Sequence, residues 1–278
     1  MLIYGSAYPV SKLALNSSLP PILFAALRNG ILFIFLIPFC NFFIPNKKFI
    51  LPLIGFSLSF GVGVFLFMNL ALYHSSVVSP IIIGAQLGIP FGIICSYFIL
   101  NERIYKKKWL LIFTSFIGII FIGFDPKLFD EIFALILVTI MSFFYGLSQV
   151  FSRLLKDLDV KLITACTGLM GLIVLFIFSI IFEGNSFQHL IVINIDTWLL
   201  IFHSSIIVSL VGHMSMFYLY KFYPVDKVLP FYALFPIFGI LLTFFIFFEI
   251  PGFFEIIGGI IVIGSVYLIH LENNKKNI

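Results

Sequence analysis

The segment Val78–Arg103, VSPIIIGAQLGIPFGIICSYFILNER, is a long apolar run closed by a charged pair, and the chain contains it twice. When the numbering is shifted by 147, the later stretch VLPFYALFPIFGILLTFFIFFE at residues 228–249 aligns with it. Four identities coincide in this register: Phe91 with Phe238, Gly92 with Gly239, Phe98 with Phe245, and Glu102 with Glu249. One sequence module has therefore been duplicated within the chain.

The duplication extends to the beginning of each module. Further matches occur in a register offset by 141: Tyr4-Gly5 with Tyr145-Gly146, and Ser11-Lys12-Leu13 with Ser152-Arg153-Leu154. The two offsets differ because the loops between the segments differ in length. We therefore predict two repeats, at residues 1–125 and 130–272, followed by a short cytoplasmic tail at 273–278.

The composition indicates that this chain is folded in lipid. Hydrophobic residues make up 62% of the sequence, charged residues only 10%, and the mean hydropathy is +1.19, whereas soluble domains carry roughly 25% charged residues. A helix needs about 20 apolar residues to cross the hydrocarbon core, and the apolar runs lack the two-residue alternation of a membrane barrel. We predict an all-α polytopic membrane protein with ten transmembrane helices, at 1–16, 22–44, 50–73, 78–100, 109–124, 132–152, 162–182, 198–220, 227–248 and 254–271.

Lysine and arginine set the predicted orientation, since short loops rich in these residues stay in the cytoplasm. With the N-terminus inside, 13 of the 16 Lys and Arg residues lie in inner loops or the C-terminal tail: Lys47, Lys48, Arg103, Lys106, Lys107, Lys108, Arg153, Lys156, Lys161, Lys221, Lys227, Lys275 and Lys276. Both termini are then cytoplasmic, and we expect the protein in the inner membrane. Because five helices is an odd number, the second repeat crosses in the opposite sense, as in the inverted repeats of secondary transporters.

The first predicted helix is short. Its ~16 residues at 1.5 Å each reach only ~24 Å, less than the ~30 Å core. In the second repeat thirteen residues separate Ile132 from Tyr145, whereas only three precede Tyr4. We therefore expect a truncated first helix, with about ten residues missing from the N-terminus.

Acidic residues inside the predicted helices would be the first candidates for binding a proton or a cation. All twelve Asp and Glu residues instead fall at helix ends or in loops. No HExxH motif, glycine-rich phosphate loop or Ser-His-Asp set with an acid at depth occurs, and the three cysteines are interpreted as small core residues. We therefore expect no enzymatic activity, no cofactor, no metal site and no nucleic-acid partner.

A polar stripe is matched between the two repeats. Tyr145 and Gln149 share one face of the predicted helix 132–152, and Tyr4 and Tyr8 occupy the equivalent positions near the N-terminus. Such a stripe has no reason to face hydrocarbon, so we expect it to line a cavity in the bundle. Hydrogen bonding between helices is the alternative.

A proline suggests a second place where the bundle opens. Gln86 and Pro90 lie on one face of the predicted helix 78–100, and Pro90 removes a backbone hydrogen bond. Tyr232 and Pro236 stand in a similar relation in the second repeat. These positions are predicted to open the helix toward a substrate, and a plain kink is the alternative.

Two further polar residues are candidates for the cavity. His213 lies near the middle of the predicted helix 198–220, where a neutral, hydrogen-bonded imidazole is the cheapest state. Structural hydrogen bonding, substrate contact and proton coupling all remain open for it. Asn69 on the predicted helix 50–73 either faces the cavity or bridges helices.

Arg28 and Lys12 are cations inside predicted helices, near the outer mouth. We expect them to snorkel to the membrane interface, because a long side chain can then keep its charge in water. Attraction of an anionic group is the alternative.

Three stretches resemble a known family: YGSAYPVSKLALNSSLPPILFAALR at 4–28, AQLGIPFGIICSYFILNERI at 85–104, and PFYALFPIFGILLTFFIFFEIPGFFEIIGGIIVIGSVYL at 230–268. They resemble the EamA family of the drug/metabolite transporter (DMT) superfamily, and within it the O-acetylserine/cysteine exporter type. The resemblance covers essentially the whole chain and implies ten helices, a cavity between the repeats, and export of amino acids or related metabolites. Tyr4 departs from the tryptophan frequent in the family, and Ile250 from the usual basic residue.

The sequence predicts a multi-pass transporter that moves a small metabolite by alternating access, with the two halves rocking about the fourth and ninth helices. The substrate-binding candidates are Tyr8, Asn69, Gln86, Tyr145, Gln149, His213 and Tyr232. Their neutral polar groups and aromatic rings imply a substrate of low net charge. Uptake of a nucleoside-like or methyl-donor metabolite is an alternative, and a membrane-embedded enzyme is disfavoured. Substrate, direction, coupling ion and the choice between monomer and homodimer stay open.

Overall fold

The computed structural model describes residues 1–40, 46–184, 186–213, 215 and 235–274, and every regular element in these ranges is a helix. The elements up to residue 131 are α1 (Leu2–Asn16), α2 (Pro21–Leu36), η1 (Ile37–Phe39), α3 (Lys47–Phe56), η2 (Ser57–Val64), α4 (Phe65–His74), α5 (Ser79–Gly84), η3 (Ala85–Leu87), α6 (Gly88–Ile99), α7 (Lys106–Ile122) and η4 (Pro126–Glu131). The later ones are α8 (Ile132–Leu154), α9 (Val160–Phe182), α10 (Ser186–Val192), α11 (Ile195–Phe202), η5 (His203–His213), α14 (Phe235–Phe247) and α15 (Phe253–Asn274).

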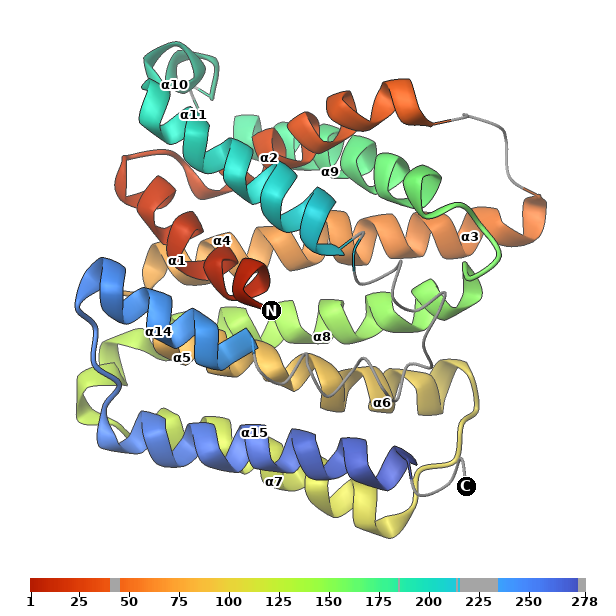
Figure 1. The fold of residues 1–278 in the computed structure, drawn as a ribbon, viewed down its shortest axis with the longest axis vertical. Helices are drawn as coiled ribbons and strands as arrows, with labels where there is room; N and C mark the ends of the chain where they lie inside the picture. Colours follow the sequence, from red (N-terminus) through yellow and green to blue (C-terminus); the bar gives the residue numbers. More distant parts are fainter. Residues whose placement is uncertain (41–45, 185, 214, 216–234, 275–278) are drawn as a thin grey trace.

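The long helices lie roughly side by side, and most are long and apolar enough to cross a membrane (Figure 1). Within the described ranges seven helical runs meet both conditions: Pro21–Phe39, Lys47–His74, Ser79–Ile99, Phe129–Leu154, Val160–Phe182, Ile195–Gly212 and Phe253–Glu272. The helices α1, α7 and α14 are shorter, with 15, 17 and 13 residues, and α14 is apolar throughout. The fold is that of a polytopic α-helical membrane protein.

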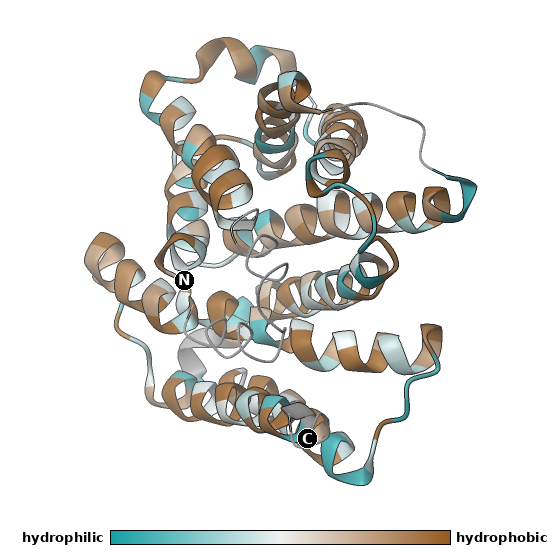
Figure 2. Cartoon of the chain, turned by 45° about the vertical axis from the view of Figure 1, so that its right-hand side comes forward, coloured by the Kyte–Doolittle hydropathy of each residue, from teal (hydrophilic) through white to brown (hydrophobic). Residues whose placement is uncertain are grey.

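Large apolar side chains cover the outside of the bundle. On α7 the side chains of Leu110, Phe113, Ile117 and Ile120 recur every three or four residues and are each more than half exposed. In water such a stripe would be unfavourable, whereas in a bilayer it meets acyl chains. Figure 2 shows hydrophobic residues along the helices and hydrophilic residues mainly at their ends.

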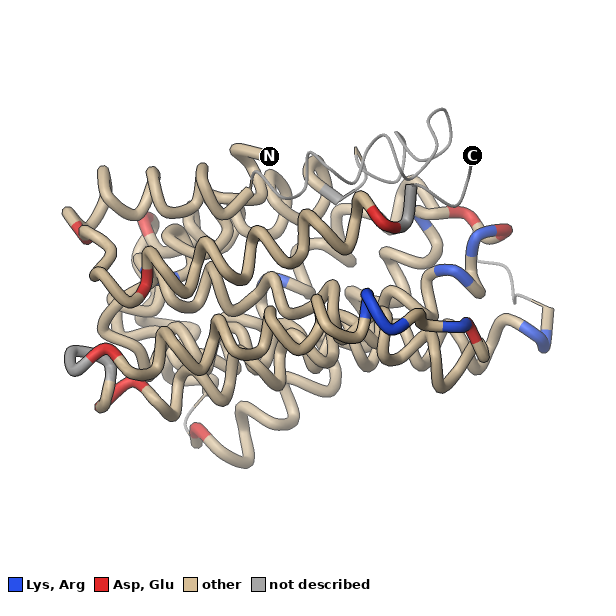
Figure 3. Tube along the Cα trace, turned by 90° about the horizontal axis from the view of Figure 1, so that it is seen from below, with Lys and Arg blue, Asp and Glu red and all other residues tan. Residues whose placement is uncertain are grey.

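Charged residues gather at the two ends of the bundle (Figure 3). Most lysines and arginines lie at one end, while the opposite end carries mainly aspartate and glutamate. This separation parallels the assignment of loops made from the sequence, because the positively charged end is the one expected in the cytoplasm.

The helices of the two predicted repeats interleave. The most extensive helix pairs are α2 with α9, α7 with α15, α6 with α8, and α1 with α14. In each pair one helix precedes residue 125 and the other follows residue 130. Within the described residues, the two sequence halves therefore pack against each other through several helix pairs and do not form two separate bundles.

Glycines allow two of these pairs to approach closely. A Cβ on Gly146 of α8 would lie 2.4 Å from the backbone nitrogen of Gly92 on α6. A Cβ on Gly5 of α1 would lie 2.6 Å from the backbone nitrogen of Gly239 on α14. These are the residues that the two sequence registers align, Gly5 with Gly146 and Gly92 with Gly239, so the same contact is made twice.

Carboxylates at the acidic end close the N-termini of helices. Glu183, after α9, accepts hydrogen bonds from the backbone nitrogens of Ile22 (2.6 Å) and Leu23 (2.9 Å) at the start of α2. Glu249, after α14, accepts bonds of 2.8 Å from the nitrogens of Val78 and Ser79 at the start of α5. Each carboxylate satisfies two backbone donors that a helix leaves open and faces the positive end of the helix dipole.

Replacing Glu183 with alanine is expected to lower the free energy of unfolding by about 1–2 kcal/mol, because two backbone donors of α2 lose their acceptor. The measurement is equilibrium unfolding in detergent micelles. Asp157→Ala, at an exposed position between α8 and α9, is the control and should stay within about 0.5 kcal/mol of the wild type. Equal stabilities for the two variants would contradict the capping role.

Candidate functional site

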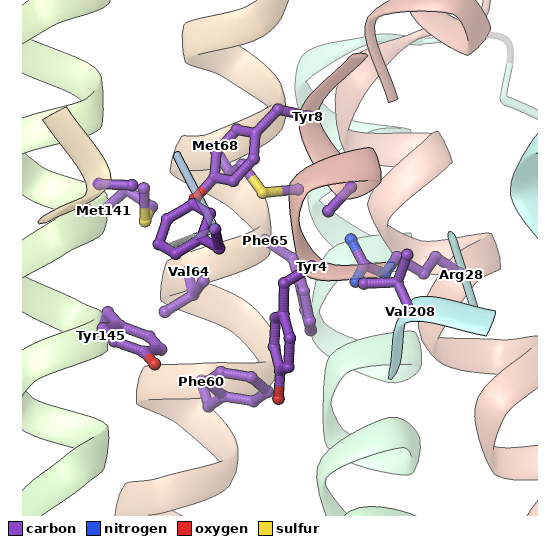
Figure 4. Close-up of a pocket in the computed structure, with 13 residues that line it drawn as sticks. Tyr4, Tyr8, Arg28, Phe60, Val64, Phe65, Met68, Met141, Tyr145 and Val208 are labelled. Carbon is purple, nitrogen blue, oxygen red and sulfur yellow. The ribbon is translucent and has the colours of Figure 1, made fainter. Parts of the chain in front are cut away.

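A cavity of about 50 Å³ lies inside the bundle (Figure 4). Its wall combines aromatic rings, apolar side chains and one arginine: Tyr4, Ala7, Tyr8, Arg28, Phe60, Val64, Phe65, Met68, Ala85, Met141, Tyr145, Val208 and Phe235. A volume of this size accommodates a small polar group, since one water molecule occupies about 30 Å³ of liquid. A whole metabolite would require the wall to move.

Irregular helical segments build two sides of the cavity. The π-helical segment η2 carries Phe60 and Val64 in the middle of the continuous run Lys47–His74. The π-helical segment η5 carries Val208. A π-helix widens the turn, is rare, and is frequently found at functional sites. The two segments also correspond in the 147-residue register, since residues 57–64 align with 204–211 inside η5.

A third irregularity lies beside the cavity, where the 3₁₀ segment η3 separates α5 from α6. Pro90 has no N–H to donate to the carbonyl of Gln86, which lies one helical turn earlier. Ala85 of η3 contributes to the cavity wall. The irregularity expected from the proline is therefore present as a 3₁₀ turn within the continuous run Ser79–Ile99, and Ala85 rather than Gln86 is the residue of this turn that lines the cavity.

Arg28 is the charged group of the cavity wall. It lies near the middle of the run Pro21–Phe39 and is only 1% exposed. Its Nε and Nη2 donate to the Ser209 hydroxyl at 3.2 and 2.9 Å, and its guanidinium carbon lies 4.1 Å from the centre of the Phe65 ring. The remaining nitrogen, Nη1, is buried and has no hydrogen-bond partner among the described residues.

Serines of η5 hold this arginine in place. The Ser209 hydroxyl, which accepts from Arg28, itself donates to the carbonyl of Ser204 at 3.1 Å. The Ser205 hydroxyl donates to the backbone carbonyl of Arg28 at 2.8 Å. Both hydroxyls therefore join α2 to η5, and they limit the directions in which the guanidinium can turn.

Aromatic rings form a large part of the remaining wall. Tyr8 stacks on Phe235 with ring centroids 6.1 Å apart, and Phe60 lies 6.3 Å from Tyr145 in a tilted arrangement. These rings come from α1, α14, η2 and α8, so both predicted repeats contribute. The wall can enclose an apolar or aromatic body while Arg28 addresses a polar end.

Of the seven candidates from the sequence, Tyr8 and Tyr145 lie in the cavity wall. Gln149 is exposed on α8, one turn beyond Tyr145, and does not contribute to the wall. The helix backbone at His213 is described but its side chain is not, and Tyr232 lies outside the described residues. The matched stripe therefore brings Tyr145 but not Gln149 to the cavity.

Asn69 and Gln86 are buried away from the cavity wall. The Asn69 amide nitrogen donates to the carbonyl of Phe65 within its own helix, at 2.7 Å. Gln86 is 1% exposed, and neither of its amide atoms has a hydrogen-bond partner among the described residues. Both were expected to face the cavity, and neither is among the residues that line it.

The expectation that Arg28 and Lys12 snorkel is wrong. Both side chains are buried, and the Lys12 ammonium donates to the carbonyls of Leu72 (2.8 Å) and Ser75 (2.6 Å) at the end of α4. Lys12 thus neutralises the negative end of that helix, while Arg28 contacts the cavity. The sequence contained a signal for the position of Arg28, because a charged residue inside an apolar membrane helix is by default a candidate functional residue.

Among the described residues, a cavity lined by one arginine and several aromatic rings lies between helices whose outer faces are apolar, which is typical of a polytopic membrane protein with an internal binding site. The model of the EamA-like transporter family matches residues 1–124 and 132–271, and the chain belongs to this family. It is therefore a polytopic membrane protein of the drug/metabolite transporter superfamily. All the residues of the cavity wall lie within the two matched stretches.

Two individual proteins are similar to the chain. The "Uncharacterized transporter YoaV" of Bacillus subtilis (strain 168) is 29% identical over 199 residues, which cover 66% of this chain and 65% of that protein. The matched part thus spans less than two thirds of this relative. A solved crystal structure of a protein with 18% sequence identity covers 97% of both chains with a TM-score of 0.55, and this likeness concerns the fold alone.

Proposed function

We propose that the protein exports a small metabolite of the amino-acid type from the cytoplasm by alternating access. The observation that carries this proposal is the cavity in which Arg28, Tyr8 and Tyr145 meet. A substrate site inside the bundle, between helices of the two repeats, is the arrangement that alternating access requires. The family resemblance supports the proposed direction, and the charge distribution supports placement in the inner membrane with both termini inside (Figure 3).

Two features support an architecture of ten helices in two inverted repeats. The close glycine contact occurs twice, between Gly92 and Gly146 and between Gly5 and Gly239. The family model also matches two successive stretches of the chain. Because the strongest helix pairs join different repeats, the moving bodies we propose are groups of helices from both repeats.

The test is counterflow in proteoliposomes. Purified protein is reconstituted, loaded with one unlabelled compound, and presented with the labelled form, using a panel of amino acids, organic acids and nucleosides. We expect accumulation of an amino acid or a related acid above empty liposomes. Accumulation of nucleosides alone would favour the alternative function, and no accumulation across the panel would contradict the proposed one.

Replacing Tyr145 with alanine is expected to reduce this counterflow at least tenfold, because the ring forms part of the cavity wall and its loss removes an aromatic contact. Gln149→Ala, one turn further along the same helix but exposed, is the matched control and should retain transport. The readout is the initial rate of labelled substrate uptake at equal protein content. A defect in Gln149→Ala with normal Tyr145→Ala would place the substrate path on the other side of α8.

A further inference from the structure

The cavity is electrostatically one-sided. Of the 13 described residues that line it, Arg28 is charged and none is acidic. The two ion pairs found among the described residues, Lys107 with Glu272 and Arg153 with Glu102, are both elsewhere. The Arg28 guanidinium is thus 1% exposed and is held by a hydroxyl and an aromatic ring, and it has no carboxylate partner in the part of the chain that the structure describes.

The geometry of the guanidinium leaves one edge available. Nε and one hydrogen of Nη2 are directed to Ser209, whereas Nη1 has no described partner. Nη1 and the second hydrogen of Nη2 form a planar fork, which matches the two oxygens of a carboxylate. Figure 4 shows the nitrogens of Arg28 turned into the cavity, toward Tyr4.

A buried cation of this kind is costly for the protein. A charged side chain in the middle of a membrane helix is unfavourable unless it is paired, and neither a hydroxyl nor a phenyl ring supplies a full negative charge. The Ser205 bond to the backbone carbonyl of Arg28 would join the same two helices with any side chain at position 28. The bonds to Ser209 use only one edge of the guanidinium, so joining α2 to η5 leaves Nη1 and its positive charge without a partner among the described residues.

We propose that Arg28 binds the carboxylate of the transported compound, whose apolar or aromatic body packs against Tyr8, Phe60 and Tyr145. This inference rests on the proposed function and narrows its substrate class to small amphipathic carboxylates. A carboxylate fits better than a phosphate dianion, because a single guanidinium balances a single negative charge. Compounds that carry only an amine meet no acidic group among the described residues of the wall.

The test compares acids with their amides. Binding of phenylalanine and phenylalaninamide, and of benzoate and benzamide, is followed by the shift in thermal unfolding temperature of the purified protein. We expect the wild type to bind each acid at least tenfold more tightly than its amide, since a charge-assisted bidentate pair is lost. Arg28→Gln should abolish this preference, and Arg28→Lys should keep part of it because the charge remains without the fork. Arg103→Gln, at an exposed position after α6, is the matched control.

Equal binding of acid and amide by the wild type, absence of binding by either acid, or an unchanged preference in Arg28→Gln would each overturn the proposal. If Arg28→Gln does not fold, Ser209→Ala supplies the test: it frees the guanidinium and should weaken acid binding several-fold without changing amide binding. Counterflow separates the two proposals. Counterflow that shows no preference for acids would support the transport function and contradict the carboxylate site. Binding of acids without counterflow would support the carboxylate site and contradict the transport function.

Discussion

Replacing Gly146 with alanine is expected to destabilise the protein by about 3 kcal/mol or more, at the upper end of the range for overpacked cores. The added Cβ would lie 2.4 Å from the nitrogen of Gly92 and 2.7 Å from the carbonyl carbon of Phe91. Both are backbone atoms, so relief requires that α6 move away from α8. The measurement is equilibrium unfolding in detergent micelles, with bound substrate absent.

The partner glycine supplies an unusually close control. A Cβ on Gly92 would meet its nearest atoms at 3.6 Å, which is ordinary van der Waals contact. Gly92→Ala should therefore be tolerated although it alters the same helix contact from the other side. Gly264→Ala on α15, where no atom lies within 4 Å of the added Cβ, should be neutral or slightly stabilising. Equal losses in Gly92→Ala and Gly146→Ala would show that helix flexibility, and not close approach, decides the effect.

The sequence repeat predicts the effect of a second substitution, at the equivalent contact between α1 and α14. Gly5 aligns with Gly146, and a Cβ on Gly5 would lie 2.6 Å from the nitrogen of Gly239. Gly5→Ala should therefore be destabilising to a similar degree on α1. The sequence repeat thus leads to a prediction about stability, because the registers that align the glycines also align the backbone atoms that these glycines contact.

The sequence could predict the lipid environment, the helical runs and the break near Pro90, because each depends on residues that are close together in the chain. Hydropathy reports the cost of placing a stretch in lipid, and proline acts on the carbonyl one turn before it. The closeness of α6 to α8 was less accessible. It depends on which face of one helix meets which face of another, and the repeated glycines only indicate that some close contact exists.

The cavity was predicted only in part. Tyr8 and Tyr145 stood out as polar residues at equivalent positions, whereas Phe60 and Phe235 could not be distinguished among the 38 phenylalanines of the chain. Gln149 was selected with Tyr145 because an ideal helix places both on one face, yet they differ in exposure. Membership of a cavity depends on the helices packed opposite, and a single helix does not carry that information.

Arg28 shows how a plausible local argument can fail. Snorkelling is the cheaper outcome when a cation can reach the interface, but the hydroxyls of Ser205 and Ser209 come from a helix 177 and 181 residues away. Once η5 packs against α2, these hydrogen bonds keep the guanidinium inside the bundle. Other interactions of the fold balance the free-energy cost of burying its charge. The same partners also remove the basis for expecting a substrate of low net charge, since the cavity wall itself carries a cation.

Replacing Arg28 with methionine is expected to separate stability from function. A charged residue at the centre of a membrane helix costs about 2.5–3.5 kcal/mol, and two hydrogen bonds to Ser209 and one cation–π contact, about 1 kcal/mol each, offset most of this cost. A methionine side chain is shorter and neutral, and its sulfur regains part of the contact with Phe65. The Ser209 hydroxyl keeps its own acceptor, the carbonyl of Ser204, so no donor is left unpaired.

Arg28→Met should therefore keep a free energy of unfolding within about 1 kcal/mol of the wild type, while counterflow of an acid substrate falls by a factor of about ten to a hundred. Unfolding in micelles and initial counterflow rates measure the two effects on one preparation. Arg103→Met, at an exposed loop position, should change neither quantity. A loss of stability of more than about 2 kcal/mol in Arg28→Met would mean that the guanidinium mainly serves packing between α2 and η5.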